Sequence, residues 1–202
     1  MSERKENPLT DIHTVISERW SPRAFDADKP VEQEKLLSVL EAARWAPSCF
    51  GDEPWRFVVT NRFEDEDAWQ QMFSILVPGN QTWAQRAPVL MLACADSVFR
   101  ANGKPNRWTH YDVGQASISL CLQATALGLV THQMGGFDVD KAREVLKIPE
   151  QFTPMAAIAL GYQGDASALD EDLQSVELAE RKRQPMSENF FSGVWGKGVS
   201  QE

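Results

Sequence analysis

Two segments of this chain are apolar throughout, without the alternation of apolar and polar residues that a half-exposed strand shows. They are residues 88–95 and residues 155–161. Unbroken apolar runs of this length are typical of strands buried on both faces. Residues 112–127 form a third such segment, which we interpret as a helix that is apolar almost all round, with Gly128 placed to close it. A fold with central strands covered on both sides and a central buried helix is therefore expected.

Weaker patterns surround these central segments. Amphipathic periodicity and capping residues predict a first helix capped by Thr10 or Asp11, and further helices at residues 32–45, 64–76 and 138–146. Pro78 and Gly79 are expected to end the helix at residues 64–76. Short strands are predicted at residues 56–60 and 131–134. Residues 164–180 are acidic and weakly patterned, which indicates surface. Helices and strands interleave irregularly, so the chain of 202 residues is expected to form one α/β or α+β domain.

The charge balance excludes several classes of partner. Twenty basic and 29 acidic residues give a formal net charge of −9, whereas nucleic acids and anionic membranes select an excess of basic surface. The three cysteines are widely separated and form no CxxC pair, so a reducing cytoplasm fits best. No apolar run is long enough to span a bilayer, and the histidines lack the spacing of metal ligands. We therefore expect a cytoplasmic protein that binds neither nucleic acid, nor membrane, nor a dedicated metal ion.

Two arginine clusters stand out against this acidic background. The first is Arg19-Trp20-Ser21-Pro22-Arg23, in which the proline makes a stiff loop, and the second is Arg181-Lys182-Arg183. Guanidinium groups bind phosphates, and glycines such as Gly135 and Gly136 let the backbone approach a ring edge. With the many aromatic residues, this inventory suits one flat ligand with a phosphate tail, and flavin mononucleotide (FMN) matches it. Ordinary basic surface turns remain the alternative interpretation of each cluster.

Motifs in a fixed order carry a resemblance to a known family. They are Arg19-x-Ser21-x-Arg23-x-Phe25, Ala46-Pro47-Ser48, Pro54-Trp55-Arg56-Phe57, Asp112-Val113-Gly114-Gln115-Ala116, Ala126-Leu127-Gly128-Leu129, Gly135-Gly136-Phe137, Leu160-Gly161-Tyr162 and Arg181-Lys182-Arg183-Gln184-Pro185. The chain resembles the nitroreductase family of FMN-dependent oxidoreductases over nearly its whole length. The resemblance implies an α+β fold of three layers, with a central, mostly antiparallel sheet flanked by helices, in an intertwined homodimer. It also implies one FMN-binding domain over residues 1–202, whose C-terminal arm from about residue 184 packs on the partner subunit.

The resemblance also implies roles for particular residues. Arg19, Ser21 and Arg183 would hold the ribityl phosphate, with Arg181 beside them and Trp20 in the same loop, while Arg23 would lie at the pyrimidine end of the ring. Pro47, Ser48 and Gly51 would come from the partner subunit and flank the ring. The backbone at Met134, Gly135 and Gly136 would face the flavin N5 edge, and Asn80 would contact the pyrimidine. No catalytic side chain is expected, because the cofactor itself carries the chemistry.

The implied activity is that of an NAD(P)H oxidoreductase working by ping-pong hydride transfer, with a nitroaromatic, a quinone or a similar small molecule as acceptor. The sequence departs from the family at Gly51 and Glu53, where many members have Asn and Gln, and at Trp83, near which some have a lysine. Two alternatives therefore stay open at this point. One is a flavin-dependent oxidase or dehalogenase on the same fold, and the other is a flavin-binding dimer without turnover.

Overall fold

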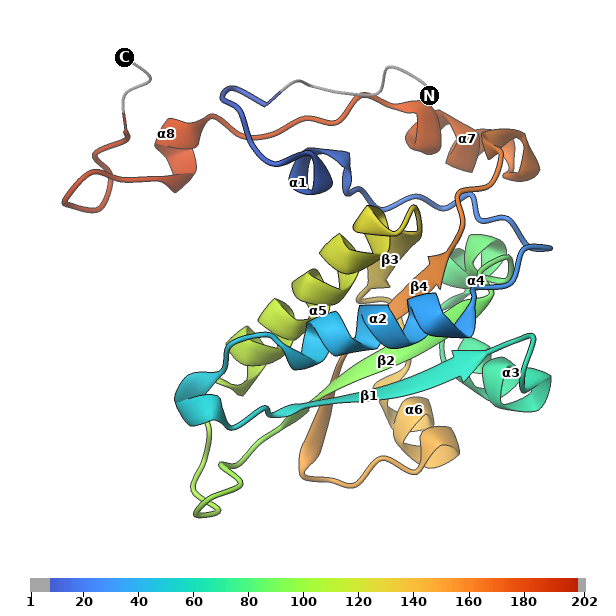
Figure 1. The fold of residues 1–202 in the computed structure, drawn as a ribbon, viewed down its shortest axis with the longest axis horizontal. Helices are drawn as coiled ribbons and strands as arrows, with labels where there is room; N and C mark the ends of the chain where they lie inside the picture. The colour runs from blue at the N-terminus through green and yellow to red at the C-terminus, as the bar shows by residue number, and fades with distance from the viewer. Residues whose placement is uncertain (1–7, 200–202) are drawn as a thin grey trace. The chain divides into compact units, whose positions relative to one another are not determined.

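The computed structural model describes residues 8–199 (Figure 1). The chain divides into two compact units, which we describe separately. The larger unit is residues 12–177. The described part of the smaller unit combines residues 8–11 with residues 178–199.

A four-stranded sheet forms the centre of the larger unit. Its strands are β1 (Trp55–Asn61), β2 (Val89–Asp96), β3 (Val130–Met134) and β4 (Phe152–Gly161), in the spatial order β1-β2-β4-β3. Every pair of neighbours is antiparallel. The structure thus confirms both predicted central strands and the α+β class.

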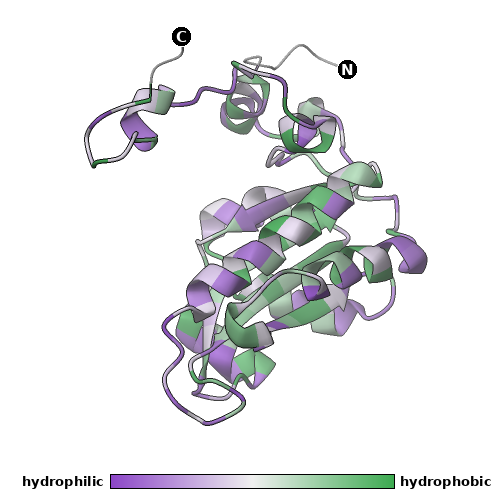
Figure 2. Ribbon diagram, turned by 60° about the vertical axis from the view of Figure 1, so that its left-hand side comes forward, coloured by the Kyte–Doolittle hydropathy of each residue, from purple (hydrophilic) through white to green (hydrophobic). Residues whose placement is uncertain are grey.

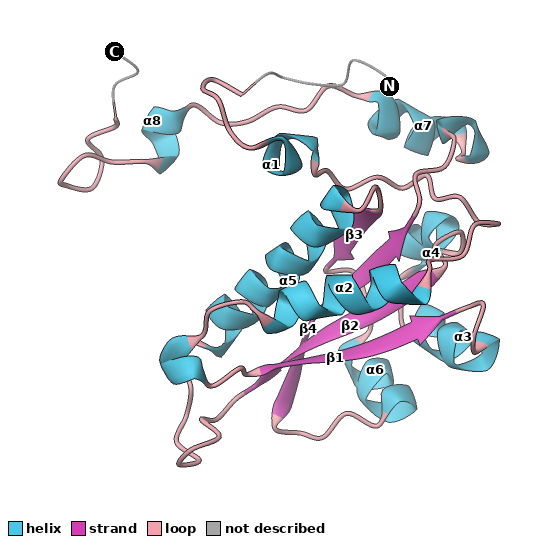
Figure 3. Cartoon of the chain, viewed as in Figure 1, coloured by secondary structure: helices cyan, strands magenta, loops and turns pink. Residues whose placement is uncertain are grey.

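Helices cover both faces of this sheet (Figures 1 and 3). On one face, α2 (Gln33–Arg44) and α5 (Thr109–Ala126) pack with every second residue of β2, beginning at Val89. The other face is packed against α3 (Glu66–Ser74), α4 (Pro78–Ala84) and α6 (Val139–Leu146). Every residue of β2 is consequently buried, which explains its unbroken apolar sequence. Figure 2 shows the strands coloured mainly as apolar, while the helices are mixed.

Helix boundaries followed the predictions where a cap decided them. The Asp138 side chain accepts a hydrogen bond from the Lys141 backbone N–H at 2.9 Å and so starts α6 as predicted. Gly128 follows α5 with φ of +74°, in the left-handed region that favours glycine. The predicted cap of the first helix, Thr10 or Asp11, was wrong. Helix α1 (Thr14–Glu18) begins after His13, whose Nδ1 accepts a hydrogen bond from the Val15 N–H.

One other expectation was wrong. Pro78 and Gly79 do not end a helix but begin α4, because the first residue of a helix needs no N–H and proline has none. The acidic stretch 164–180 lies mostly at the surface, as predicted, and contains a helix that was not predicted, α7 (Glu171–Leu178).

Helix α5 is also less buried than its composition suggested. Val113, Ala116 and Leu120 lie in the core, but Tyr111 is 68% exposed and Ile118 is 41% exposed. One side of α5 therefore faces away from the sheet of its own chain.

The smaller unit carries α8 (Met186–Asn189) and the aromatic residues of the C-terminal arm. The rings of Phe191 and Trp195 lie 4.9 Å apart, and Phe191 pairs with Gly198 in an isolated bridge. Trp195 is nevertheless 91% exposed. Among residues 8–199, no helix is both long enough and apolar enough to cross a membrane.

Candidate functional site

The loop that carries Arg19, Trp20, Ser21 and Arg23 extends the central sheet. It leads into Phe25, which pairs antiparallel with Gln163 just beyond the end of β4. The Gly164 N–H donates to the Ala24 carbonyl at 2.8 Å. A Cβ at Gly164 would lie 2.5 Å from the Phe25 carbonyl carbon, so only glycine permits this approach. The backbone of the arginine loop is therefore fixed against β4.

A buried carboxylate holds the same loop from the other side. Glu177, on α7, is 1% exposed, and its two oxygens accept hydrogen bonds from the backbone N–H groups of Arg23 and Ala24 at 2.8 and 3.1 Å. A carboxylate that accepts two N–H groups in this way forms charge-assisted bonds, which are stronger than neutral ones. Sequence reasoning missed Glu177 because it lies in the stretch expected to be surface. The available signal was its position four residues after Leu173, on the inward side of a helix.

A third contact joins the loop to β3. His132 Nδ1 lies 2.9 Å from the Pro22 carbonyl oxygen, and because that oxygen only accepts, Nδ1 carries the hydrogen. Burial lowers the pKa of His132, and the positive charge of Arg23 lowers it further, while the hydrogen bond to Pro22 opposes both. The imidazole is therefore neutral near pH 7. Its ring also packs against Trp83 of α4, with centroids 4.5 Å apart.

The side chains of the loop that are predicted to bind the cofactor are at least partly accessible. Arg19 Nη1 donates to Ser21 Oγ at 3.4 Å, and Ser21 is exposed. Trp20 and Arg23 are each half-buried. A guanidinium and a hydroxyl are thus side by side on a rigid backbone, and the guanidinium has further donors beyond the one that Ser21 accepts.

Asn80 and the residues after β3 form a second part of the predicted site. Asn80 Nδ2 donates to the Gly136 carbonyl at 2.9 Å, and a Cβ at Gly136 would lie 2.7 Å from that same nitrogen. A Cβ at Gly135 would meet nothing within 4 Å, so the backbone there is open on one side. Met134 is buried. Asn80 therefore positions the glycine pair, and its predicted contact with a pyrimidine ring stays a prediction.

The loop that carries Pro47, Ser48 and Gly51 is equally well fixed. Ser48 Oγ accepts from the Glu53 N–H at 3.0 Å, and the Cys49 N–H donates to the buried carboxylate of Asp112 at 3.0 Å. Gly51 has φ of +66°. This loop connects α2 to β1.

The register of the sheet places these two loops at opposite ends. Trp55, just after the Ser48 loop, pairs with Ala95 at one end of β2. At the other end, Val89 pairs with Leu160, three residues before the Gln163 that pairs with Phe25. Eight residues of strand cover roughly 25 Å. Within one chain, the structure does not bring Pro47, Ser48 and Gly51 to the arginine loop.

Arg181 and Arg183 belong to the smaller unit. Arg183 is exposed, and its Nη1 donates to the Lys182 carbonyl at 2.9 Å. Their part in the site stays a prediction.

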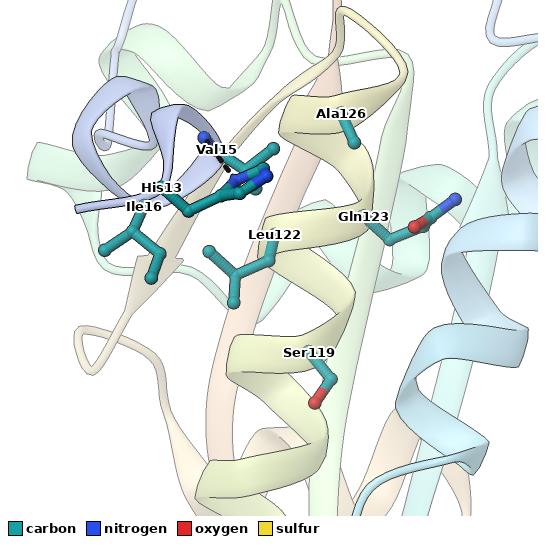
Figure 4. A pocket seen from close by; sticks show the side chains of 7 residues that line it. All are labelled: His13, Val15, Ile16, Ser119, Leu122, Gln123 and Ala126. Atoms are coloured by element: carbon teal, nitrogen blue, oxygen red, sulfur yellow. Dashed lines mark hydrogen bonds between the residues drawn. The ribbon is translucent and has the colours of Figure 1, made fainter.

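A hollow between α1 and α5 was not expected from the sequence (Figure 4). Its volume is about 500 Å³. The lining residues carry no carboxylate, lysine or arginine, and they are His13, Val15, Ile16, Ser119, Leu122, Gln123 and Ala126. Figure 4 shows Leu122 extending from α5 toward α1, with Ile16 on the opposite side of the hollow. The absence of cations from this lining makes it unsuited to a phosphate.

Comparison with known proteins gives concordant matches. A family model described as the Nitroreductase family matches residues 16–162. A crystal structure described as an oxidoreductase containing FMN is 36% identical, with a TM-score of 0.89, and the match covers 98% of this chain and 99% of that one. A protein of Thermus thermophilus named NADH dehydrogenase is 30% identical, over 78% of this chain and 89% of its own length. One of Bacillus subtilis named FMN reductase (NAD(P)H) is 25% identical, over 79% of this chain and 69% of its own length.

Proposed function

The chain belongs to the nitroreductase family, and on that premise we propose that it is an FMN-dependent oxidoreductase. It takes electrons from NAD(P)H and gives them to a nitroaromatic, a quinone or a similar acceptor. The observations that carry this proposal are the fixed arginine loop and the open backbone of Gly135. The FMN in the similar crystal structure and the reductase name of the Bacillus subtilis relative support it.

The residues present fit the phosphate end of FMN. Arg19 and Ser21 lie together at the edge of the loop and combine a permanent positive charge with a hydroxyl donor. This local cation lies in a chain whose net charge is −9, so an anion is attracted to the loop and not to the surface in general.

The residues near β3 fit the ring. Because a Cβ at Gly135 would meet nothing, a flat group can approach the backbone of Gly135 closely, and in our proposal its edge also faces the backbone of Met134 and Gly136. Arg23 would stabilise negative charge at the pyrimidine end by Coulomb attraction in a partly dry site. FMN, when bound, supplies the hydride chemistry, so that NAD(P)H and the acceptor are used in turn. The protein itself binds the cofactor, orients the two substrates and excludes water.

A second copy of the chain completes this site in our proposal. Pro47, Ser48 and Gly51 lie at the far end of the sheet from their own arginine loop, so only a partner can supply them. Support comes from the exposed side of α5, where Tyr111 and Ile118 face away from the core of their own chain. The aromatic arm from about residue 184 would pack on the partner, which would cover Trp195.

A visible spectrum of the purified protein tests the assignment directly. We expect a flavin band that bleaches when NADH or NADPH is added without oxygen. Double-reciprocal plots at several acceptor concentrations should give parallel lines. The mass in solution should be twice the 22.7 kDa of one chain. A colourless protein that also fails to take up added FMN would contradict the cofactor assignment.

A further inference from the structure

Phe50 combines two unusual properties. It is 94% exposed, and its backbone has φ of +56° and ψ of +18°, in the left-handed region. Side chains rarely adopt this conformation because the Cβ approaches the following carbonyl oxygen. Glu53, three residues on, also has positive φ, at +50°. Strained positions of this kind cluster at ligand-binding sites, where the surrounding structure maintains them.

The surroundings of Phe50 maintain it firmly. Besides the bonds to Ser48 and Asp112, the Asp52 carboxylate accepts from the Arg100 backbone N–H at 2.9 Å. This bond joins the loop to the hairpin at residues 98–105, which closes with the Phe99 N–H donating to the Lys104 carbonyl at 2.8 Å. The ring of Phe99, in that hairpin, meets the ring of Phe50 edge to face, with centroids 6.1 Å apart.

Charged side chains also hold the backbone on both sides of Phe50. Arg100 Nη2 lies 3.5 Å from the Glu53 carbonyl, and Arg56 Nη1 lies 3.1 Å from the same oxygen. Asp52 is engaged by the hairpin, and Asp112 by the Cys49 N–H. The exposed face of Phe50 is thus an apolar surface on a rigid support.

We propose that Phe50, backed by Phe99, is a shelf on which the flat aromatic ring of a substrate stacks. The inference rests on the proposed function, in which Ser48 and Gly51, on either side of Phe50, flank the flavin of the partner subunit. In the proposed dimer, a side chain between those two positions would face the side of the flavin on which a substrate lies. A flat ring gains from an aromatic partner beyond the area that it buries, whereas a saturated ring gains only from the area. Phe50 is therefore a specificity residue for aromatic substrates.

The test compares the flavin-loaded protein with its Phe50→Gly and Phe50→Trp variants. Glycine removes the ring and suits the left-handed backbone, so Phe50→Gly should melt at or above the temperature of the unchanged protein. Phe50→Trp keeps an aromatic face. Two uncharged probes that the enzyme does not reduce are titrated by calorimetry. Benzamide is flat and aromatic, and cyclohexanecarboxamide is its saturated counterpart.

Phe50→Gly should weaken benzamide binding about tenfold, the equivalent of the stacking energy of an aromatic pair. Cyclohexanecarboxamide should lose much less, and Phe50→Trp should bind both probes as the unchanged protein does. Phe63→Gly is the matched control, because Phe63 is a half-exposed phenylalanine beyond the opposite end of β1. Steady-state KM values for nitrobenzene and for NADH then distinguish the acceptor ring from the nicotinamide ring as the occupant.

Equal binding of benzamide to the Phe50→Gly and unchanged proteins would overturn the shelf and leave the proposed function intact. Loss of the dimer or of bound FMN in Phe50→Gly would also overturn it, since Phe50 would then be an interface or cofactor contact. An unchanged protein that binds no FMN would contradict the proposed function itself.

Discussion

Removing the carboxylate of Glu177 should loosen the arginine loop. In Glu177→Gln, one side-chain oxygen still accepts from a backbone N–H, but the amide nitrogen faces the second N–H, donor against donor. One buried N–H is then unpaired, which costs about 1–3 kcal/mol. In Glu177→Ala, the N–H groups of both Arg23 and Ala24 lose their acceptor, so the cost is about 2–6 kcal/mol.

These magnitudes decide which variant to use. The free energy of unfolding of an ordinary domain is about 5–15 kcal/mol. Glu177→Gln should therefore fold, whereas the stability of Glu177→Ala would be marginal. Urea unfolding at pH 7 measures the free energy of unfolding of Glu177→Gln. FMN affinity, measured by fluorescence quenching, should fall in parallel because Arg19 and Ser21 are carried by the loosened loop.

The matched control is Glu180→Gln, which makes the same change at an exposed position. It should alter the free energy of unfolding by less than about 0.5 kcal/mol. If Glu177→Gln changed stability as little as Glu180→Gln does, the carboxylate would not hold the loop, and the account of the arginine loop given above would be refuted.

Three further predictions follow from the same site. Arg19→Ala should weaken FMN binding about 10- to 100-fold in equilibrium dialysis, since a hydrogen bond to a charged group contributes about 1.5–3 kcal/mol, and unchanged affinity would remove Arg19 from the phosphate site. Because burial lowers the pKa of His132 below its usual 6.5, the unfolded state binds more protons, so stability should be full above about pH 6.5 and fall as the pH drops below it. His132→Gln should make Tm depend less on pH in this range. An unaltered pH profile of Tm would count against His132 as the cause. Gly136→Ala should lower stability by about 1–3 kcal/mol because its Cβ meets Asn80, whereas Gly135→Ala should leave Tm unchanged and weaken FMN binding.

The central layers could be predicted because burial on both faces leaves a direct mark in the sequence. The unbroken apolar run of β2 reflects helices on both of its sides, and the side chain of Asp138 caps α6 by a bond only three residues long. Such features depend on the residue itself or on its nearest neighbours. The two wrong helix boundaries also depended on local signals. Proline can end one helix or begin the next, and Pro78 begins α4. The first helix is capped by His13 and not by Thr10 or Asp11.

The support of the site could not be predicted, because it depends on contacts between distant parts of the chain. Glu177 contacts Arg23 across 154 positions, and His132 contacts Pro22 across 110. An acidic residue in a polar stretch gives no local sign that its carboxylate is buried. The motif residues identified the parts of the site, whereas the sheet register alone showed that two of those parts lie at opposite ends of one chain.

Each half of the proposed site is held entirely by its own chain, and this has a consequence for cofactor binding. Glu177 and His132 fix the arginine loop, and Asp112 fixes the Ser48 loop, so neither half needs the partner in order to form. FMN then binds two preformed halves and stabilises the dimer by mass action, so that dimer dissociation and cofactor release are linked. Diluting the loaded protein should therefore release fluorescent FMN at the same concentration at which light scattering shows the mass falling to 22.7 kDa. Addition of FMN should shift both transitions to lower protein concentration by the same factor. FMN that stays bound to a species of 22.7 kDa would show that one chain suffices to hold the cofactor, and would contradict the composite site.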